Sequence, residues 1–322
     1  MSFLEEFEEF MRAHGISEGF TPVPVIAGSE DEASSQQSEL QDLVGQTSFV
    51  VEDRWRSRPE QMRARILAHA GVFTQVYARN CELRRIDKPT AAAFLKQSHD
   101  YADALCRYRY GLFLKRLTGE KQYGSAASAA SSPTILTSSA APAGATVSHS
   151  ATGVSFFSPS PADSTILSHC AALEPGTLVA VAEFSNLRNL DLDGTRSRSC
   201  QWIRYASLPG VRVEGGMGKV LQGLIKDADP DDVMTYADLE WSDGRAYRAL
   251  GFEFIDYRRP VLFRIDPLTW QRTAVDSRKG LSPSHDFLFP GAPSGDSAIT
   301  SAEASPLWYQ NFGSARYRLR LR

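Results

Sequence analysis

The feature that most constrains the fold is an alternation of strand-like and helix-like segments between residues 201 and 252. Residues Trp202 to Leu208 are rich in β-branched and aromatic side chains and precede the turn Pro209-Gly210, which predicts a strand. A glycine-rich run follows at 214–218. After it, four apolar residues fall at the spacing of one helical face: Val220, Leu221, Leu224 and Ile225. The stretch therefore predicts a strand, a glycine turn and a helix.

The same order repeats directly afterwards. Asp232 to Ala237 is typical of a buried strand. Ser242 to Leu250 is typical of a helix, with Ser242 as its N-cap and Gly251 at its C-terminal end. A strand, a helix, a strand and a helix in this order indicate a partly parallel sheet with helical crossover connections.

The glycine turn before the first of these helices has the layout of an anion site. Glycines let the backbone approach a phosphate closely, and the free N–H groups at a helix N-terminus hold the negative charge. The backbone from Gly215 to Lys219 is placed for this purpose, and the Lys219 ammonium would add positive charge. The alternative is that the glycines serve close packing only.

Two motifs in this stretch carry a resemblance to a known family. The glycine turn Val213-Glu-Gly-Gly-Met-Gly218 and the run Tyr247-Arg-Ala-Leu-Gly-Phe252 resemble the core of the GNAT superfamily, acyltransferases that use acyl-coenzyme A. A narrower similarity, to GNAT-like proteins of phages and mobile elements, lies in Ala237-Asp-Leu-Glu-Trp-Ser-Asp-Gly244. The resemblance covers about Val76 to Ile265, without a low-complexity insertion.

The resemblance implies both a fold and an activity. The fold would be α/β (α+β), with a mixed, mostly antiparallel central sheet, a β-α-β-α core and flanking helices. The activity would be that of an acyl-CoA-dependent N-acyltransferase. Acetyl-CoA or another acyl-CoA would be the co-substrate, and a small-molecule or protein amine would attack the thioester directly.

The resemblance also assigns roles to residues. The carrier would be bound by the strand that ends at Leu208, which is the fourth strand of the family's core, and by the glycine turn. The residues are Ser207, Leu208, Val213, Gly215, Gly216, Met217, Gly218 and Lys219. A backbone N–H near Ser207 and Leu208 would polarise the thioester. Tyr247 resembles the family's general acid, which protonates the departing thiolate; the alternative is an aromatic side chain packed on a helix.

The sequence departs from the family pattern at two points. Val213 stands where the glycine motif usually begins with Gln or Arg, and the predicted fourth strand carries no Glu to act as the base. Glu183 on the third strand, Asp238 at the end of the fifth, or Glu240 could substitute as the base. His99, Glu240 and Trp241 would border the acceptor.

A second class of function is a GNAT-like module that has lost catalysis and binds nucleic acid. The residues for it are a cluster of arginines: Arg54, Arg56, Arg58, Arg63 and Arg65. The basic tail up to Arg322 could join them. The alternative is a solvated helical face, on which Glu52, Asp53 and Glu60 pair with these arginines.

The chain is expected to divide into a core and several extensions. Residues 1–46 would form an amphipathic helix and a flexible linker, the linker being the polar segment Gly28 to Gln41. Residues 47–75 would add a strand and a helix. The core would span 76–266 and be interrupted by the low-complexity insertion 121–165. Residues 267–305 would be a loop-rich linker, and 306–322 a C-terminal strand, favoured as a half-exposed edge strand over a basic strip.

The first half of the core is expected to contain three strands and one helix. The strands would be Val76 to Ile86, Tyr108 to Leu117 and Thr177 to Phe184, and the last two would be neighbours in a hairpin with an enlarged loop. Between the first two, Asp87 would cap a helix that ends near Ser98.

Composition excludes several classes of protein. A formal net charge of -3 argues against a body that binds polyanions overall. The cysteines Cys81, Cys106, Cys170 and Cys200 are widely spaced, which suggests neither a zinc site nor a disulfide framework, and we expect no metal. No run approaches the ~20 apolar residues of a membrane span, and the acidic N-terminus does not resemble a signal peptide. We therefore expect a cytoplasmic protein without a membrane partner.

Overall fold

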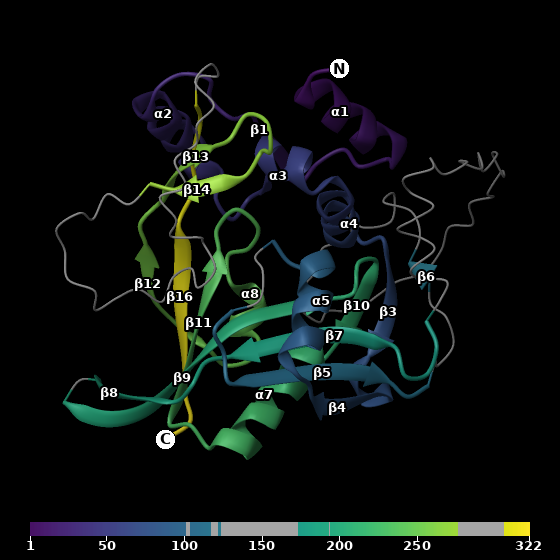
Figure 1. The fold of residues 1–322 in the computed structure, drawn as a ribbon, viewed down its shortest axis with the longest axis vertical. Coiled ribbons are helices and arrows are strands. Elements are labelled where there is room, and N and C mark those ends of the chain that lie inside the picture. Colours follow the sequence, from purple (N-terminus) through teal and green to yellow (C-terminus); the bar gives the residue numbers. More distant parts are fainter. Residues whose placement is uncertain (101–103, 117–121, 124–172, 193, 276–305) are drawn as a thin grey trace, which may run out of the picture.

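The computed structural model describes residues 1–100, 104–116, 122–123, 173–192, 194–275 and 306–322. Its largest feature is an eight-stranded sheet in the order β12-β16-β11-β9-β7-β5-β4, with β8 paired to β9 (Figure 1). The strands are β4 (Cys81–Arg85), β5 (Tyr108–Leu114), β7 (Leu178–Phe184), β8 (Arg188–Leu192), β9 (Thr195–Ser207), β11 (Asp232–Asp238), β12 (Glu253–Arg258) and β16 (Ser314–Arg320). The predicted mixed, mostly antiparallel sheet is confirmed.

The sheet opens in its middle. Strands β4, β5, β7 and β9 run antiparallel to one another, as do β11, β16 and β12. Between these two groups, β9 and β11 run parallel and pair only from Ser199 to Gln201 against Asp232 to Met234. Beyond these pairs the two strands separate. The expected neighbours β5 and β7 do form an antiparallel pair.

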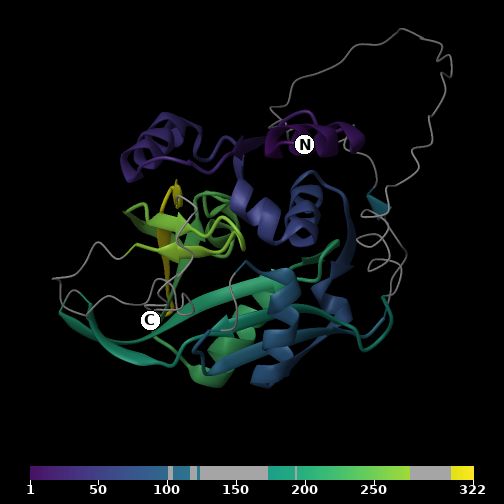
Figure 2. The same cartoon turned by 45° about the horizontal axis from the view of Figure 1, so that its top comes forward.

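Two helices cover opposite faces of this sheet. Helix α5 (Lys88–Ser98) begins after its N-cap Asp87, as predicted, and packs Phe94 and Leu95 on Val181 of β7. Helix α7 (Gly216–Ala228) packs Leu224 in the cluster that contains the next residue along, Ala182. Because successive side chains of a strand point to opposite faces, α5 and α7 lie on opposite sides of the sheet (Figures 1 and 2).

The predicted first strand is divided between two sheets. Residues Val76 to Ile86 contain the end of β3 (Phe73–Tyr77), a short 3-10 helix (Ala78–Asn80) and β4. Strand β3 pairs with β10 (Val211–Glu214) and β6 (Gln122–Tyr123) in a separate small sheet. The prediction of one continuous strand is wrong because a turn at the 3-10 helix redirects the chain. Strand β10 leads directly into α7.

Both predicted linkers contain folded elements. A third sheet, in the order β14-β13-β15, takes in the first part of the second predicted linker. Its strands are β13 (Leu262–Ile265), β14 (Arg272–Ala274) and β15 (Leu307–Gln310). The polar segment expected to be a linker is instead helix α2 (Glu30–Leu40), which begins at a capping box of Ser29 and Glu32. It is fixed to β15, because Ser34 donates a hydrogen bond to Gln310 at 2.8 Å and Gln310 donates one to Gln37. The rest of the second segment, 276–305, lies outside the described residues, as do residue 121 and residues 124–165 of the predicted insertion.

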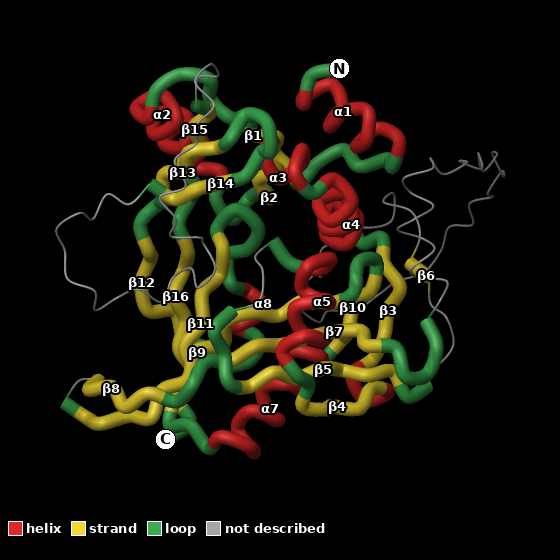
Figure 3. The backbone as a smooth tube through the Cα atoms, viewed as in Figure 1, coloured by secondary structure: helices red, strands yellow, loops and turns green. Residues whose placement is uncertain are grey.

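The first helices form a second apolar cluster. Helix α1 (Phe3–Ala13) presents Phe3, Phe7 and Phe10 to Trp55, as its apolar face predicted. Trp55 belongs to α3 (Glu52–Ser57), which precedes the predicted α4 (Pro59–His69). Before α3, β1 (Phe20–Val23) and β2 (Ser48–Val51) form a parallel pair. This cluster lies beside the separated ends of β9 and β11, as the tube view shows (Figure 3).

The C-terminal strand corrects a further expectation. Strand β16 is not an edge strand: it lies between β11 and β12, and β12 is at the edge. Its side chains are accommodated on both faces, because Tyr317 is 1% exposed while Arg316 pairs with Asp256 and Arg318 with Asp232. Carboxylates on both neighbouring strands therefore neutralise the arginines of an interior strand.

Two other elements differ in length from their predictions. Strand β9 begins at Thr195, before the predicted start at Trp202, and its first residues pair with β8 in a hairpin in which Leu192 lies opposite Thr195. Helix α8 spans only Arg245–Arg248, and its N-cap is Gly244 rather than Ser242. Gly244 has a φ of 80°, which ends the extended segment before the helix begins.

Candidate functional site

A cavity of about 950 Å³ lies where β9 and β11 separate. We call it the central cavity. It is lined by β9 from Gln201 to Ser207, by β11 at Tyr236 to Asp238, by Met217 at the start of α7, and by α8. Other parts of the wall come from α4, from the C-terminal end of α5, from residues 45–48 and 208–212, and from residues 241–243 after β11. The parting of the two strands thus brings the C-terminal end of β9, the first turn of α7 and α8 around one space.

The predicted thioester donors differ in availability. Leu208 N–H donates a hydrogen bond to the Val179 carbonyl on the neighbouring strand, at 2.9 Å, so it is occupied. N–H groups of a strand alternate between its two edges, which directs the Ser207 N–H towards β11 and the central cavity. Of the two residues, Ser207 can therefore donate to a bound group.

Tyr247 lines the central cavity from α8. Its ring packs among Trp202, Phe252 and Tyr317, with centroids 5.8, 5.7 and 6.1 Å away. Burial raises the pKa of Tyr247, against the opposing effect of a hydrogen bond with Thr235, so the phenol carries its proton at neutral pH. The structure therefore supports the packed aromatic ring, and Tyr247 is also one of the residues that line the cavity.

Asp238 also lines the central cavity, at the end of β11. Burial, followed by the charge of Glu240, raises the pKa of Asp238 to about 7. Its Oδ1 accepts a hydrogen bond from the Glu240 N–H at 3.0 Å. A carboxyl group with a pKa near neutrality can exchange a proton in either direction, which suits a general base.

Glu240 has a different place. It is 5% exposed, does not line the central cavity, and accepts hydrogen bonds from Tyr309 at 2.8 Å and Arg272 at 3.2 Å. Arg272 in turn pairs with Asp53. The predicted acceptor role of Glu240 therefore has no support in the geometry. Its effect on the cavity is through its charge, which acts on Asp238.

This leads to a prediction on Asp238. Replacing Glu240 with glutamine keeps an oxygen for Tyr309 and Arg272 but removes the negative charge, so we expect the pKa of Asp238 to fall below its present value of about 7. An NMR titration of the Asp238 carboxyl carbon would measure the change. Glu253→Gln, on the exposed edge strand β12, is the matched control and should leave that pKa unchanged.

At the far end of the cavity, charged and aromatic groups from three elements meet. The Arg65 guanidinium lies over the Trp241 ring, 4.0 Å from its centroid, and also pairs with Asp100. The His69 ring packs against the Trp241 ring, with the two centroids 5.3 Å apart. Burial, followed by the charge of Arg65, lowers the pKa of His69 to about 4. Trp241 and His99 line the cavity as the acceptor prediction requires.

Among the described residues of the cavity wall, Ser98 Oγ and Asp100 Oδ1 are buried polar atoms without a hydrogen-bond partner. The Tyr205 hydroxyl is also in the wall, and burial raises the pKa of Tyr205 to about 12 against the opposing effect of a hydrogen bond with Ser207, so this hydroxyl is neutral. Unpaired buried polar groups cost free energy and gather where a ligand completes them. Sequence reasoning did not single out Tyr205, and it placed Asp100 only as the neighbour of His99 in the loop expected to border the acceptor.

The glycine turn separates into residues that face the cavity and residues that do not. Gly215 adopts a φ of 74°, and a Cβ on Gly216 would lie 2.3 Å from the Tyr205 hydroxyl, so both positions require glycine. Met217 faces the cavity. A Cβ on Gly218 would only make ordinary contact with Leu250. Val213 is 7% exposed and belongs to the core.

Lys219 is turned away from the predicted phosphate. Its Nζ donates hydrogen bonds to the carbonyls of Ala78, at 2.8 Å, and Cys81, at 2.6 Å. This ammonium instead holds the turn between β3 and β4 against α7. The predicted anion site at α7 would therefore depend on backbone N–H groups.

Glu183 is placed outside the central cavity. It is fully buried and accepts hydrogen bonds from Arg109 at 3.2 Å, Arg204 at 3.4 Å and the Cys106 thiol at 3.5 Å. A carboxylate held between two guanidiniums is poorly suited to take a proton. Of the three candidate bases, Asp238 alone combines a place in the cavity wall with a raised pKa.

The arginine cluster is largely engaged within the protein. Arg56 pairs with Glu6 and Glu52. Arg63 lies over the rings of Phe10 and Trp55, Arg65 pairs with Asp100, and Arg58 donates a hydrogen bond to the His99 carbonyl. Arg54 contributes its charge near Asp100. These contacts favour the interpretation that the arginines are paired within the protein. Of the expected carboxylates Glu52 is one of the partners, whereas Glu6 and Asp100 were not expected.

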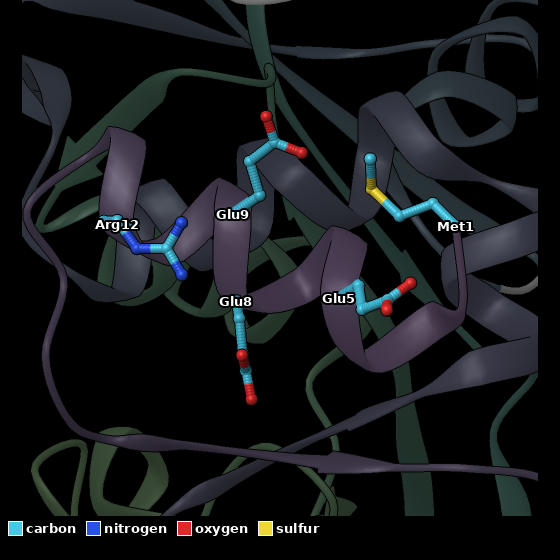
Figure 4. Close-up of a pocket in the computed structure, with 5 residues that line it drawn as sticks. All are labelled: Met1, Glu5, Glu8, Glu9 and Arg12. Carbon is cyan, nitrogen blue, oxygen red and sulfur yellow. The ribbon is translucent and has the colours of Figure 1, made fainter.

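A second hollow, of about 460 Å³, lies on α1 and is lined by Met1, Glu5, Glu8, Glu9 and Arg12. Figure 4 shows Glu8 and Glu9 pointing in opposite directions, so these side chains do not converge on a ligand. Among the described residues, no group of His, Cys, Asp and Glu side chains is arranged to hold a metal ion. Within the same part of the chain, every helix is too short or too polar to cross a membrane.

A comparison with protein-family models and a search of curated proteins both find no match for this chain.

Proposed function

We propose that the chain is an acyl-CoA-dependent N-acyltransferase of GNAT type, which passes an acyl group such as acetyl to an amine by direct attack. The observation that carries this proposal is the central cavity. It opens where β9 and β11 part, it touches the first turn of α7 at Met217, and both Asp238 and Tyr247 line it.

The order of strands supports the proposal. Counted along the chain, β4, β5, β7, β9 and β11 correspond to the first five strands that the resemblance implied, and they are neighbours in the sheet in that same order. The parallel pair β9 and β11, with α7 as its crossover, is where the resemblance implied the acyl carrier. The N-terminus of α7 offers free N–H groups to the carrier's diphosphate.

Three residues of the cavity wall have a role in the proposed reaction. Asp238 accepts the proton of the amine nitrogen as that nitrogen attacks the thioester carbon. The Ser207 N–H donates a hydrogen bond to the carbonyl oxygen while negative charge develops on it. Tyr247 donates its proton to the sulfur as the C–S bond breaks, and solvent returns a proton from Asp238 to Tyr247. The products are an amide and free coenzyme A.

The first test is calorimetric titration of the protein with acetyl-CoA and coenzyme A. We expect both to bind, and we expect the Met217→Glu variant to bind them about 10-fold more weakly or worse, because the new carboxylate repels the diphosphate. A carboxylate in the first turn of a helix is compatible with folding. Met217→Gln, which has the same size without the charge, is the matched control and should bind nearly as well as the parent.

If the parent protein binds neither compound, the acyltransferase proposal is wrong. Salt-dependent binding to DNA or RNA would then be the property to measure, since the second class of function requires it and the first does not.

A further inference from the structure

Strand β12 forms one end of the eight-stranded sheet, and among the described residues no strand pairs with its outer side. Three of its six residues carry large, apolar, exposed side chains: Phe254 is 44% exposed, Ile255 41% and Tyr257 69%. At the opposite end of the sheet, β4 instead presents the charged, half-exposed side chains of Glu82 and Arg84. Charged side chains keep a sheet edge from pairing, whereas an apolar edge strand invites pairing. Of the two ends, β12 therefore has the character of an interface.

A β-bulge gathers the aromatic side chains of β12 on one face. The register of β12 against β16 shifts after Phe254, so Ile255 is an extra residue. On either side of the bulge, Phe254 lies opposite Tyr317 and Tyr257 lies opposite Ala315, two positions apart on β16. Their side chains consequently share a face of the sheet, and the centroids of the Phe254 and Tyr257 rings are 4.8 Å apart.

The other face of β12 is charged. Glu253, Asp256 and Arg258 lie opposite alternate residues of β16, so these three side chains share that face. Asp256 forms an ion pair with Arg316. Glu253 and Arg258 stand at the two ends of the strand, and neither forms an ion pair with another described residue. An acid and a base of the same strand are thus left available for a partner outside the chain.

These residues complement themselves in an antiparallel pair of β12 strands. We take the register in which Asp256 lies on a two-fold axis perpendicular to the sheet and the bulged residue stays out of the pairing, as it does against β16. Phe254 then faces Tyr257 of the second copy, and Glu253 faces Arg258 of the second copy. In both pairs the two side chains are on the same face, as opposite residues of antiparallel strands must be. The Asp256 carboxylates at the axis are each neutralised by the arginine of their own β16.

We propose that β12 pairs with β12 of a second copy of this chain, antiparallel and about this two-fold axis, so that the sheets of the two copies continue into one another. Aromatic and oppositely charged cross-strand pairs stabilise a sheet, and each of them occurs twice around the axis. A bulge discourages pairing with an arbitrary strand, so the self-matching register singles out a copy of the chain as the partner. No residue of β12 lines the central cavity, and the interface does not depend on the proposed function.

Sedimentation velocity of the full chain between about 5 and 500 µM tests the pairing, because a contact between two short strands buries little surface and should form a dimer at micromolar concentration. We expect the parent to change from monomer to dimer across this range. Tyr257→Glu should weaken the dimer by about 10-fold or more, because it places a carboxylate in the aromatic pair. Leu268→Glu, at a 76% exposed position before β14, is the matched control and should dimerise like the parent.

An exchange of charges tests the register. Glu253→Arg alone and Arg258→Glu alone each bring like charges together at both ends of the pair, so each should weaken the dimer by about 10-fold, and the double variant should restore it. The proposal would be overturned by a parent that stays monomeric throughout the range, by a Tyr257→Glu variant that dimerises like the parent, or by a double variant that dimerises no more tightly than the single ones.

Discussion

Replacing Asp238 with asparagine is expected to lower kcat by about 10²- to 10⁴-fold, the usual contribution of a positioned general base. The rate would be measured as thiol release from acetyl-CoA with propylamine as the acceptor. In the parent protein the rate should rise with pH around 7, because the pKa of Asp238 lies there and the base must be ionised. A variant that keeps the parent rate would remove Asp238 from the chemistry.

The same substitution should make the folded protein more stable above neutral pH. The pKa of Asp238 is raised above its ordinary value of 3.8 to about 7, so the folded protein holds this proton over a range in which the unfolded chain releases it. The parent therefore loses stability as pH rises from about 4 to about 7, and Asp238→Asn avoids that loss. Urea unfolding at pH 8 should find the variant more stable than the parent; lower stability there would contradict the assignment.

Replacing Glu183 with alanine is expected to lower the free energy of unfolding by about 3 to 5 kcal/mol. The change removes the Glu183 carboxylate from Arg109 and Arg204, whose side chains are only 13% and 4% exposed. Removing one partner of a buried ion pair is costly because the charge that stays behind is desolvated and less well compensated. Urea unfolding at neutral pH, followed by circular dichroism, measures the difference.

The control is Glu82→Ala on β4, which removes a carboxylate from an exposed pair with Arg84 and should have little effect. Similar losses in the two variants would mean that the buried pair adds no more than a surface pair. Neither residue lines the central cavity, so coenzyme A binding should persist in both under conditions where the protein is folded.

Local patterns predicted much of the fold. The α7 helix was predictable because Gly215 fixes the turn and Leu221 and Leu224 give the buried face. Helix α5 was predictable from the cap at Asp87. Apolar periodicity did not predict helix α2, because Ala33 and Gln37 are its only buried residues and its partner Gln310 lies more than 270 residues along the chain.

The place of β16 within the sheet and the charges around Asp238 could not be predicted, because both depend on residues far away in the sequence. The alternation of apolar and basic residues around Tyr317 predicts a strand, but Asp232 and Asp256, which make an interior place possible for it, come from other strands. Asp238 was one of several candidate bases in the sequence. Only the structure separates it from Glu183, because it buries Asp238 in the cavity wall beside Glu240 and places Glu183 between two guanidiniums.

The interior place of β16 has a consequence for synthesis of the protein. Strands β11 and β12 leave the ribosome well before β16, and each then presents an unpaired edge that β16 later covers on both sides. During that interval, the nascent sheet can pair with other chains. Chaperone binding to the nascent chain should therefore persist until residues 314–320 have emerged, and ribosome-bound chains stalled before this segment should be the aggregation-prone species.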